Sequence, residues 1–339
     1  MSELFELMQI NLLSPMVLAF ALGMIVVFIK SDLRLPEQIV TAISVYLLFS
    51  IGLDGGFDLA EATLQSFIGP ALVAIAIGML IPVMAYVALT KFGGLSSSNA
   101  LAIGIHYGGV SSVTLSAGIA FLNDLGQNFE GFLPTLYVIM ELPAFFVALL
   151  LVAWRVDGKR NQVGTSGTIT MSRSQRLQQV LRLVLSGKTF ALLAGGVLIG
   201  LLSGEAGKAQ VEPFFFDLFP GILTLFLLQM GTVVGERIGE LRYVGFFVIF
   251  YALAAPVVNA LLGITLGTLV GLSTGGAFIL GIIAASASFI SAPVVVRANL
   301  PQANPGIHMT TALVVTFPFN LILGMPLYYE FAIIVSNII

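Results

Sequence analysis

Long apolar stretches separated by short polar segments run through almost the whole chain. Most of them approach the length of about 20 residues that an α-helix needs to cross a bilayer. Their apolar residues are continuous rather than alternating, which argues against a membrane β-barrel. The pattern predicts an all-α membrane protein with two groups of five transmembrane helices around a polar segment at 155–187. The predicted spans are 14–30, 36–54, 67–90, 98–122, 132–154, 188–203, 219–236, 242–271, 275–298 and 308–336.

The composition supports this class and excludes several functions. Of the 339 residues, 58% are hydrophobic and 9% are charged, and the mean hydropathy is +1.04. Soluble domains carry about 25% charged residues. The net charge of −3 argues against a nucleic-acid partner, and the lack of cysteine excludes disulfides and thiol chemistry. Because the chain has no phosphate-binding loop, nucleophile elbow or zinc-protease motif, we expect neither an enzyme nor an ATP-driven pump.

Basic residues gather in the polar segment at 155–187, so the positive-inside rule places this segment in the cytoplasm. Alternating outward from it, 13 of the 14 Lys and Arg residues fall on the cytoplasmic side, and Lys208 is the exception. Acidic loops and both termini then fall outside. Within the segment, 173–186 is predicted to form an amphipathic helix on the inner membrane surface, although its charges could simply set the topology.

The two groups of five spans show weak internal similarity. Gly94-Leu95-Ser96 aligns with Gly271-Leu272-Ser273 at an offset of 177 residues, and this register gives seven identities in the 21 positions from 94 to 114. Because each group has an odd number of spans, the second copy would have the opposite orientation. We therefore predict an inverted repeat, with five helices in 1–154, a basic linker at 155–187 and five helices in 188–339. Many secondary transporters have this plan and bind substrate at the repeat interface.

Small and hydroxylated residues occupy the middle of the fourth and ninth spans, at matching positions of the two halves. Gly108-Gly109 favours backbone unwinding, and Pro293 removes a helix donor. We predict two discontinuous helices that cross at their breaks. Their second halves would begin near 110–112 and 287–289 and present free amides and positive dipole ends to a small anion. The alternative is close helix packing through small residues.

Glu141 lies in the middle of the span 132–154, where an ionised carboxylate is costly and points to function. No Lys or Arg lies in the middle of any span, so its expected partner is a coupling cation or a proton. A protonated or hydrogen-bonded structural Glu is the alternative. The corresponding region of the second half offers the oxygen of Asn320, which leads to the hypothesis of a sodium site made by Glu141, Asn320 and oxygens at the breaks.

Three further residues carry weaker signals. His106 and His308 sit at different places in their spans and make no metal-ligand pattern, so we interpret each as a hydrogen-bonded or interfacial histidine. Asp54-Gly55-Gly56 is interpreted as a turn at the end of a span, with an Asp54 that lines an outer vestibule as the alternative.

Three runs, at 106–114, 284–293 and 317–320, also carry a family resemblance. They are similar to the corresponding runs of the sodium-dependent bicarbonate transporters of cyanobacteria and their bacterial relatives. The resemblance extends over both halves and implies a ten-helix inverted repeat with a gate and a core domain. It further implies a homotrimer in the bacterial inner membrane that imports bicarbonate with sodium as the coupling ion. The family's PII-like regulatory protein is a less expected partner here, because the central linker is short.

The resemblance also points to the site, at the crossing of the fourth and ninth spans. Together with the pattern of the breaks, it leads us to predict two sets of residues and no catalytic residue or cofactor. The anion set is Gly109, Val110, Ser111, Ser112, Ser286, Ala287, Ser288 and Phe289, and the sodium set is Glu141, Thr114, Ser291 and Asn320.

Other functions remain as alternatives. Since the first run departs from the cyanobacterial arrangement, the substrate could be another small anion, such as a short organic acid. An anion channel would need no sodium and gives no role to Glu141. A receptor would be expected to carry an output domain, and the 33 residues of 155–187 are too few to fold as one.

Overall fold

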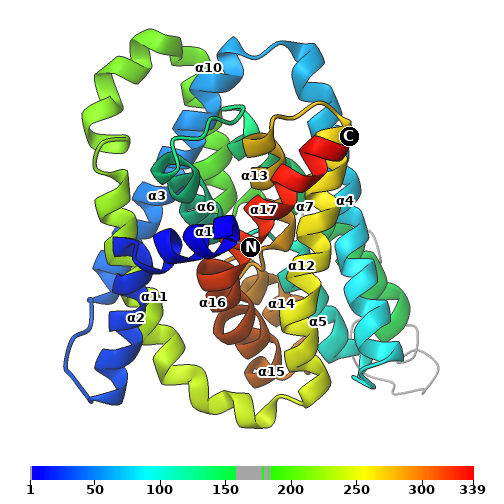
Figure 1. Ribbon diagram of the computed structural model, residues 1–339. Helices are drawn as coiled ribbons and strands as arrows, with labels where there is room; N and C mark the ends of the chain where they lie inside the picture. The colour runs from blue at the N-terminus through cyan, green and yellow to red at the C-terminus, as the bar shows by residue number, and fades with distance from the viewer. Residues whose placement is uncertain (1, 158–177, 179–181, 183–184) are drawn as a thin grey trace.

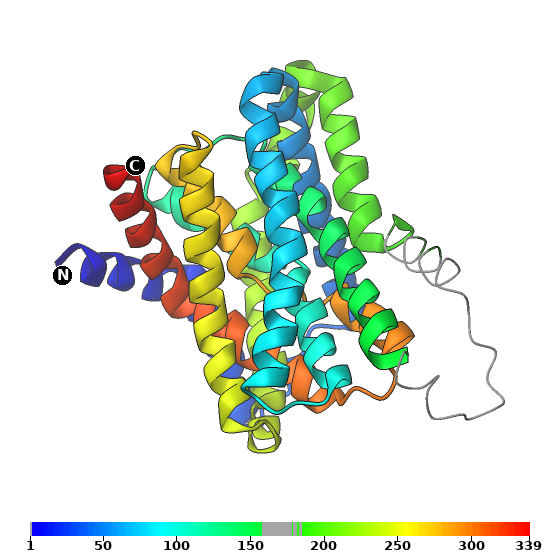
Figure 2. The same ribbon diagram turned by 90° about the vertical axis from the view of Figure 1, so that its right-hand side faces the viewer.

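The computed structural model describes residues 2–157, 178, 182 and 185–339, and every regular element within them is a helix (Figures 1 and 2). Eight of these helices are long and apolar enough to cross a membrane. They confirm a multi-pass helical protein. The eight are Glu37–Ala60, Gln65–Lys91, Ser97–Asp124, Leu133–Arg155, Lys188–Phe215, Phe219–Tyr243, Phe246–Leu269 and Pro305–Ile338.

The first predicted span is short in the structure. It corresponds to α2 (Pro15–Phe28), which is bent by 57° from the preceding α1 (Ser2–Leu12). The 14 residues of α2 cover only about 21 Å. Ser14 starts α2 by accepting a hydrogen bond from the Val17 amide, and Pro15 occupies its first turn. Figure 2 shows α1 extending sideways from the bundle.

Four helices pack into a unit that we call the panel: α2, α3 (Glu37–Glu61), α10 (Lys188–Phe215) and α11 (Phe219–Arg237). Glycines face each other where these helices pair. A Cβ added to Gly231 would lie 3.0 Å from the Cα of Gly23, and one added to Gly196 would lie 2.9 Å from the Cα of Gly52. The backbone of α2 can therefore approach that of α11 closely, and the same holds for α3 and α10. Small residues commonly allow such close helix packing in membranes.

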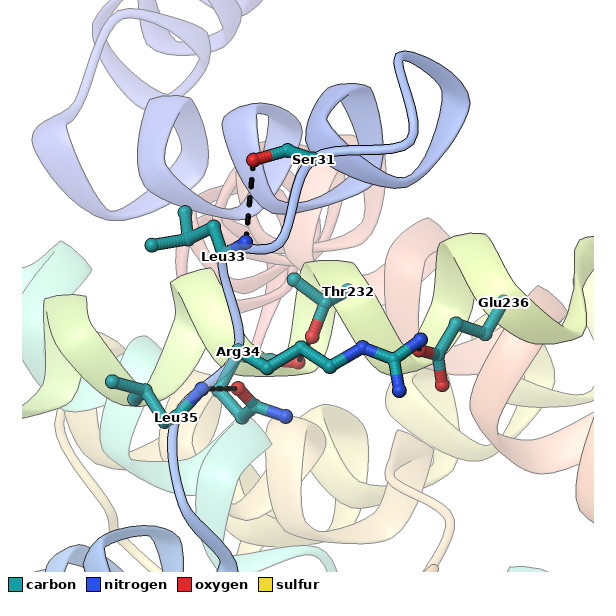
Figure 3. A network of polar contacts seen from close by, with 7 residues as sticks. Ser31, Leu33, Arg34, Leu35, Thr232 and Glu236 are labelled. Carbon is teal, nitrogen blue, oxygen red and sulfur yellow. Dashed lines mark hydrogen bonds and ion pairs between the residues drawn. The ribbon is translucent and has the colours of Figure 1, made fainter.

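The loop between α2 and α3 also rests on α11 (Figure 3). Arg34 pairs with Glu236 at 2.8 Å, and the Leu35 amide donates to the Gln229 side chain at 3.3 Å. Both partners lie on α11. Although an exposed ion pair alone contributes little, these contacts join the loop to the same helix that α2 packs against.

Ten of the other described helices form a second unit that we call the core. Its C-terminal helix contains two π-helical turns, Thr310–Thr316 and Asn320–Gly324, on either side of Pro318. Such turns are expected next to a proline, which cannot donate to the regular ladder. The core helices are α4 (Leu64–Lys91), α5 (Ser97–Gly108), α6 (Ser112–Asp124), α7 (Leu133–Val152), α12 (Phe246–Leu269), α13 (Thr274–Ala285), α14 (Ala292–Asn299), α15 (Pro305–Met309), α16 (Phe317–Phe319) and α17 (Met325–Ile338).

One predicted helix end, at Asp54-Gly55-Gly56, is wrong. The helix α3 continues through Asp54-Gly55-Gly56, because these glycines serve packing: a Cβ on Gly56 would lie 2.3 Å from the Val197 carbonyl oxygen of α10. The predicted end of the span 188–203, in contrast, is confirmed by a break in α10: Gly204 has non-helical backbone angles (φ 57°, ψ −162°), and a second helical segment continues from there to Phe215. Lys208 therefore lies within a helix and pairs with Asp58 at 3.2 Å, so the one basic residue expected outside has an acidic partner.

The linker prediction cannot be compared with the structure in the same way. Most of the proposed surface helix at 173–186 lies outside the described residues, and it stays a prediction. A π-helical turn, Ala153–Asp157, ends the described part of the first half.

Candidate functional site

The fourth and ninth predicted spans are each interrupted near their middle. The helix α5 ends at Gly108, and the extended residue Gly109 (φ −74°, ψ 150°) leads to α6, whose N-cap Ser111 accepts the amide of Thr114 at 3.2 Å. The helix α13 ends at Ala285 and is followed by an extended Ser286 (φ −75°, ψ 160°). We call the residues 109–111 and 286–291 the first and second breaks.

The helices before the two breaks match each other closely. Both α5 and α13 have 12 residues. Each starts behind a serine cap, Ser96 or Ser273, and each cap follows a glycine of positive φ, Gly94 (64°) or Gly271 (87°). All these features repeat at the offset of 177 residues. In Figure 1, α5 enters the core from the lower end and α13 from the upper end.

The second break is longer than we predicted. The helix α14 begins at Ala292, so Ala287, Ser288 and Phe289 lie in a non-helical segment and not at a helix N-terminus. Pro293 is the physical reason, because it has no N–H and fits only the first turn of a helix.

The two breaks touch each other. The Ser288 amide donates to the carbonyl oxygens of His106 at 2.7 Å and Gly109 at 3.2 Å, and the Ser111 amide donates to the Ser286 hydroxyl at 3.0 Å. A Cβ on Gly109 would lie 2.7 Å from the Cβ of Ser288, so the contact requires glycine. Two of the amides predicted for the anion, those of Ser111 and Ser288, thus already have partners within the protein.

Glu141 is connected to the second break through two serines. The Ser291 hydroxyl donates to Oε1 of Glu141 at 2.6 Å, and the hydroxyls of Ser288 and Ser291 lie 2.7 Å apart. Since the Ser291 proton points to the carboxylate, Ser288 donates to Ser291. Among the described residues, the buried polar side chains include one carboxylate, that of Glu141, and no Lys or Arg.

The other predicted sodium ligands lie near the breaks but outside this chain of hydroxyls. Thr114 is buried in the first turn of α6. Asn320 donates to the Ala285 carbonyl at 2.9 Å and accepts from the Tyr328 hydroxyl at 2.8 Å. Its amide therefore ties the end of α13 to the C-terminal helix.

Sequence reasoning missed two features of the site. Tyr137 donates its hydroxyl to the Val110 carbonyl at 3.0 Å, and its position one helical turn before Glu141 was the available signal. His106 and His308, which no spacing connected, lie in contact, with 2.8 Å between Nε2 of His106 and Nδ1 of His308. The signal for His106 was its place directly before Tyr107 and the Gly108-Gly109 pair.

Two cavities lie between the panel and the core. One, of about 280 Å³, is lined by Asp54, Asp124, Glu212 and Lys208 together with apolar residues. The other, of about 330 Å³, has Lys188 and Arg237 in its wall and reaches the second break at Phe289 and Ile290. The described chain thus offers a cavity rich in acidic residues and a basic one along the same contact surface. Asp54 lines the first cavity, as its alternative interpretation proposed.

Comparison with known proteins identifies a family for the chain. A family model described as the Na+-dependent bicarbonate transporter superfamily matches residues 15–333. The match includes both breaks, Glu141 and the lining residues of both cavities. No protein of curated function matches the chain.

Proposed function

Because the chain belongs to the Na+-dependent bicarbonate transporter superfamily, we propose that it imports bicarbonate together with sodium and binds both ions where two broken helices cross. Membership of this family makes the chain a transporter and not an enzyme. The proposal adds the location of the ions, the residues that hold them and the coupling between them.

The observation that carries the proposal is the hydrogen-bonded chain of Glu141, Ser291 and Ser288 at the point where the breaks touch. A buried carboxylate needs a counter-charge or a proton. No Lys or Arg is buried in the described residues, and a hard cation such as sodium prefers the carboxylate and hydroxyl oxygens present here. Sodium bound at Glu141 would also place a positive charge beside the anion.

The contacts between the breaks reduce the number of backbone amides that are available to bind the anion. The first amides of a helix have no acceptor within it. In α6, Ser111 takes the amide of Thr114, which leaves the amides of Ser112 and Val113 for a ligand. The positive end of the α6 dipole, about half a unit charge, favours an anion at the same place. We propose that these amides and those of Ala287, Phe289 and Ile290 hold bicarbonate, with the Ser112 and Thr114 hydroxyls nearby.

We propose the larger architecture on separate grounds. The matching bounds of α5 and α13 and the paired glycines of the panel support a ten-span inverted repeat whose discontinuous helices cross. In this arrangement both termini lie outside and the linker at 155–187 lies in the cytoplasm of a bacterial cell, against the inner membrane. The family resemblance adds a homotrimer.

Uptake of labelled bicarbonate into proteoliposomes tests the proposed function. An inward sodium gradient should accelerate uptake by the purified chain, and a potassium gradient of the same size should not. Equal uptake under both gradients would indicate a channel. Sodium-driven uptake of labelled acetate or another short organic acid, without uptake of labelled bicarbonate, would assign the other substrate class.

A further inference from the structure

The two histidines of the chain form a buried pair that links three segments of the core. His106, at the end of α5, is fully buried, and His308, in α15, is 4% exposed. Nδ1 of His106 lies 2.5 Å from the carbonyl oxygen of Ser288, and Nε2 of His106 lies 2.8 Å from Nδ1 of His308. The pair therefore connects the C-terminal helix to the second break.

The carbonyl of Ser288 sets the direction of these hydrogen bonds. A carbonyl oxygen accepts and cannot donate, so Nδ1 of His106 carries the proton. In a neutral His106, Nε2 then has no proton and must accept, which makes Nδ1 of His308 the donor. Donation therefore runs from His308 to His106 and from His106 to Ser288.

His106 holds the Ser288 residue from both sides. Its main-chain carbonyl accepts the Ser288 amide at 2.7 Å, and its ring donates to the Ser288 carbonyl at 2.5 Å. Across a planar trans peptide, the carbonyl and the following N–H point in opposite directions. With the Ser288 carbonyl turned toward His106, the amide of Phe289 points away from α5. Phe289 itself lines the basic cavity between the panel and the core.

We propose that His106, held in one tautomer by His308, is a positioning residue that turns the Ser288–Phe289 peptide so that the Phe289 amide faces the transported anion. The same contact keeps the Ser288 carbonyl, a negative dipole end, away from the anion. This role rests on the proposed function, since it names one amide of the anion site and the residues that orient it.

The tautomers can be measured without any transport assay. The chain contains two histidines in total, so full-length protein with isotope-labelled imidazole nitrogens, purified through a tag free of histidine, gives one set of NMR signals for each. We expect the proton of neutral His106 on Nδ1 and a coupling across the bond to His308. A proton on Nε2 of His106 would overturn the proposal.

Asparagine and glutamine variants then test the positioning role. The amide nitrogen of Asn lies near the place of histidine Nδ1, and that of Gln lies near Nε2. His106→Asn should therefore keep the donor to Ser288 and bicarbonate uptake with a nearly normal KM. His106→Gln should raise the KM for bicarbonate by roughly tenfold with kcat almost unchanged. For His308 as well, we expect the Gln variant to have a higher KM for bicarbonate than the Asn variant, with a smaller difference between the two than at His106.

The outcomes separate this inference from the proposed function. Equal KM values for the Asn and Gln variants, or parallel losses in kcat alone, would overturn the positioning role, and so would failure of both His106 variants to assemble while both His308 variants transport normally. Wild-type protein without sodium-dependent bicarbonate uptake would instead overturn the proposed function, while the NMR measurement still reports the hydrogen-bonded pair.

Discussion

Serine residues at and next to the breaks differ in their hydrogen-bond partners. The Ser291 hydroxyl donates to the buried carboxylate of Glu141 and accepts a hydrogen bond from the Ser288 hydroxyl. Ser112, in contrast, lies at the start of α6, and its carbonyl accepts from Ser116. A hydrogen bond to a charged group contributes about 1.5–3 kcal/mol, and an ordinary one about 0.5–1.5 kcal/mol.

Alanine substitutions should reveal this difference. We expect Ser291→Ala to weaken sodium activation of uptake by about 10- to 100-fold, because Glu141 loses its charge-assisted partner. Ser112→Ala should cost about 2- to 10-fold and act on bicarbonate more than on sodium. Initial uptake rates at varied sodium and bicarbonate concentrations measure both effects. A larger sodium defect in Ser112→Ala than in Ser291→Ala would contradict the assignment.

At the scale of helices, two pairs of glycines show what sequence alone could and could not predict. Gly108-Gly109 ends a helix as predicted, because the lost ladder is replaced by the bond from the Ser288 amide to the Gly109 carbonyl. Gly55-Gly56 leaves α3 unbroken and packs against α10. The dipeptides are identical, and partners far away in sequence decide between them.

At the predicted site, too, local features could be predicted from the sequence, and contacts between distant segments could not. Hydropathy predicted the eight described helices that are long and apolar enough to cross a membrane. The isolated carboxylate of Glu141 is buried, and its role as a sodium ligand stays a prediction. Local chemistry also located both breaks. The contacts of His106 with Ser288 and with His308, in contrast, depend on packing between residues that are 182 and 202 positions apart. Periodicity along the chain does not record such contacts.

The glycine contacts of the panel give a stability prediction with a neighbouring control. Gly196 faces the backbone of Gly52, whereas Gly195 faces open space. Gly196→Leu should force α10 away from α3 and cost at least 1–3 kcal/mol as an order-of-magnitude estimate. Gly195→Leu should have little effect. The apparent Tm of the two purified variants at one heating rate measures the difference, and equal values would show that this packing is unimportant.

The whole molecule consists of the panel and the core, with cavities of opposite charge between them. The cavity with Asp54, Asp124 and Glu212 lies at the end that we propose to be outside, and the one with Lys188 and Arg237 at the proposed cytoplasmic end. An electronegative cavity attracts sodium, and a basic cavity raises the local concentration of an anion.

Topology can be tested directly because the chain has no cysteine. Gln127, between α6 and α7, and Asp32, between α2 and α3, are both exposed. In intact cells, a membrane-impermeant maleimide should label Gln127→Cys and should label Asp32→Cys only after permeabilisation. The reverse pattern would invert the orientation of the whole molecule, including the two cavities.

The central claim is that sodium and bicarbonate move together through one site that contains Glu141. Co-uptake of labelled sodium and labelled bicarbonate into the same proteoliposomes tests it most directly, for the wild type, for Glu141→Gln and for the exposed control Glu37→Gln. Gln keeps the oxygen that accepts from Ser291 and removes the charge. The account predicts linked uptake of both ions by the wild type and Glu37→Gln, and loss of sodium uptake and of sodium-activated bicarbonate uptake in folded Glu141→Gln. Unchanged sodium activation in Glu141→Gln would contradict it.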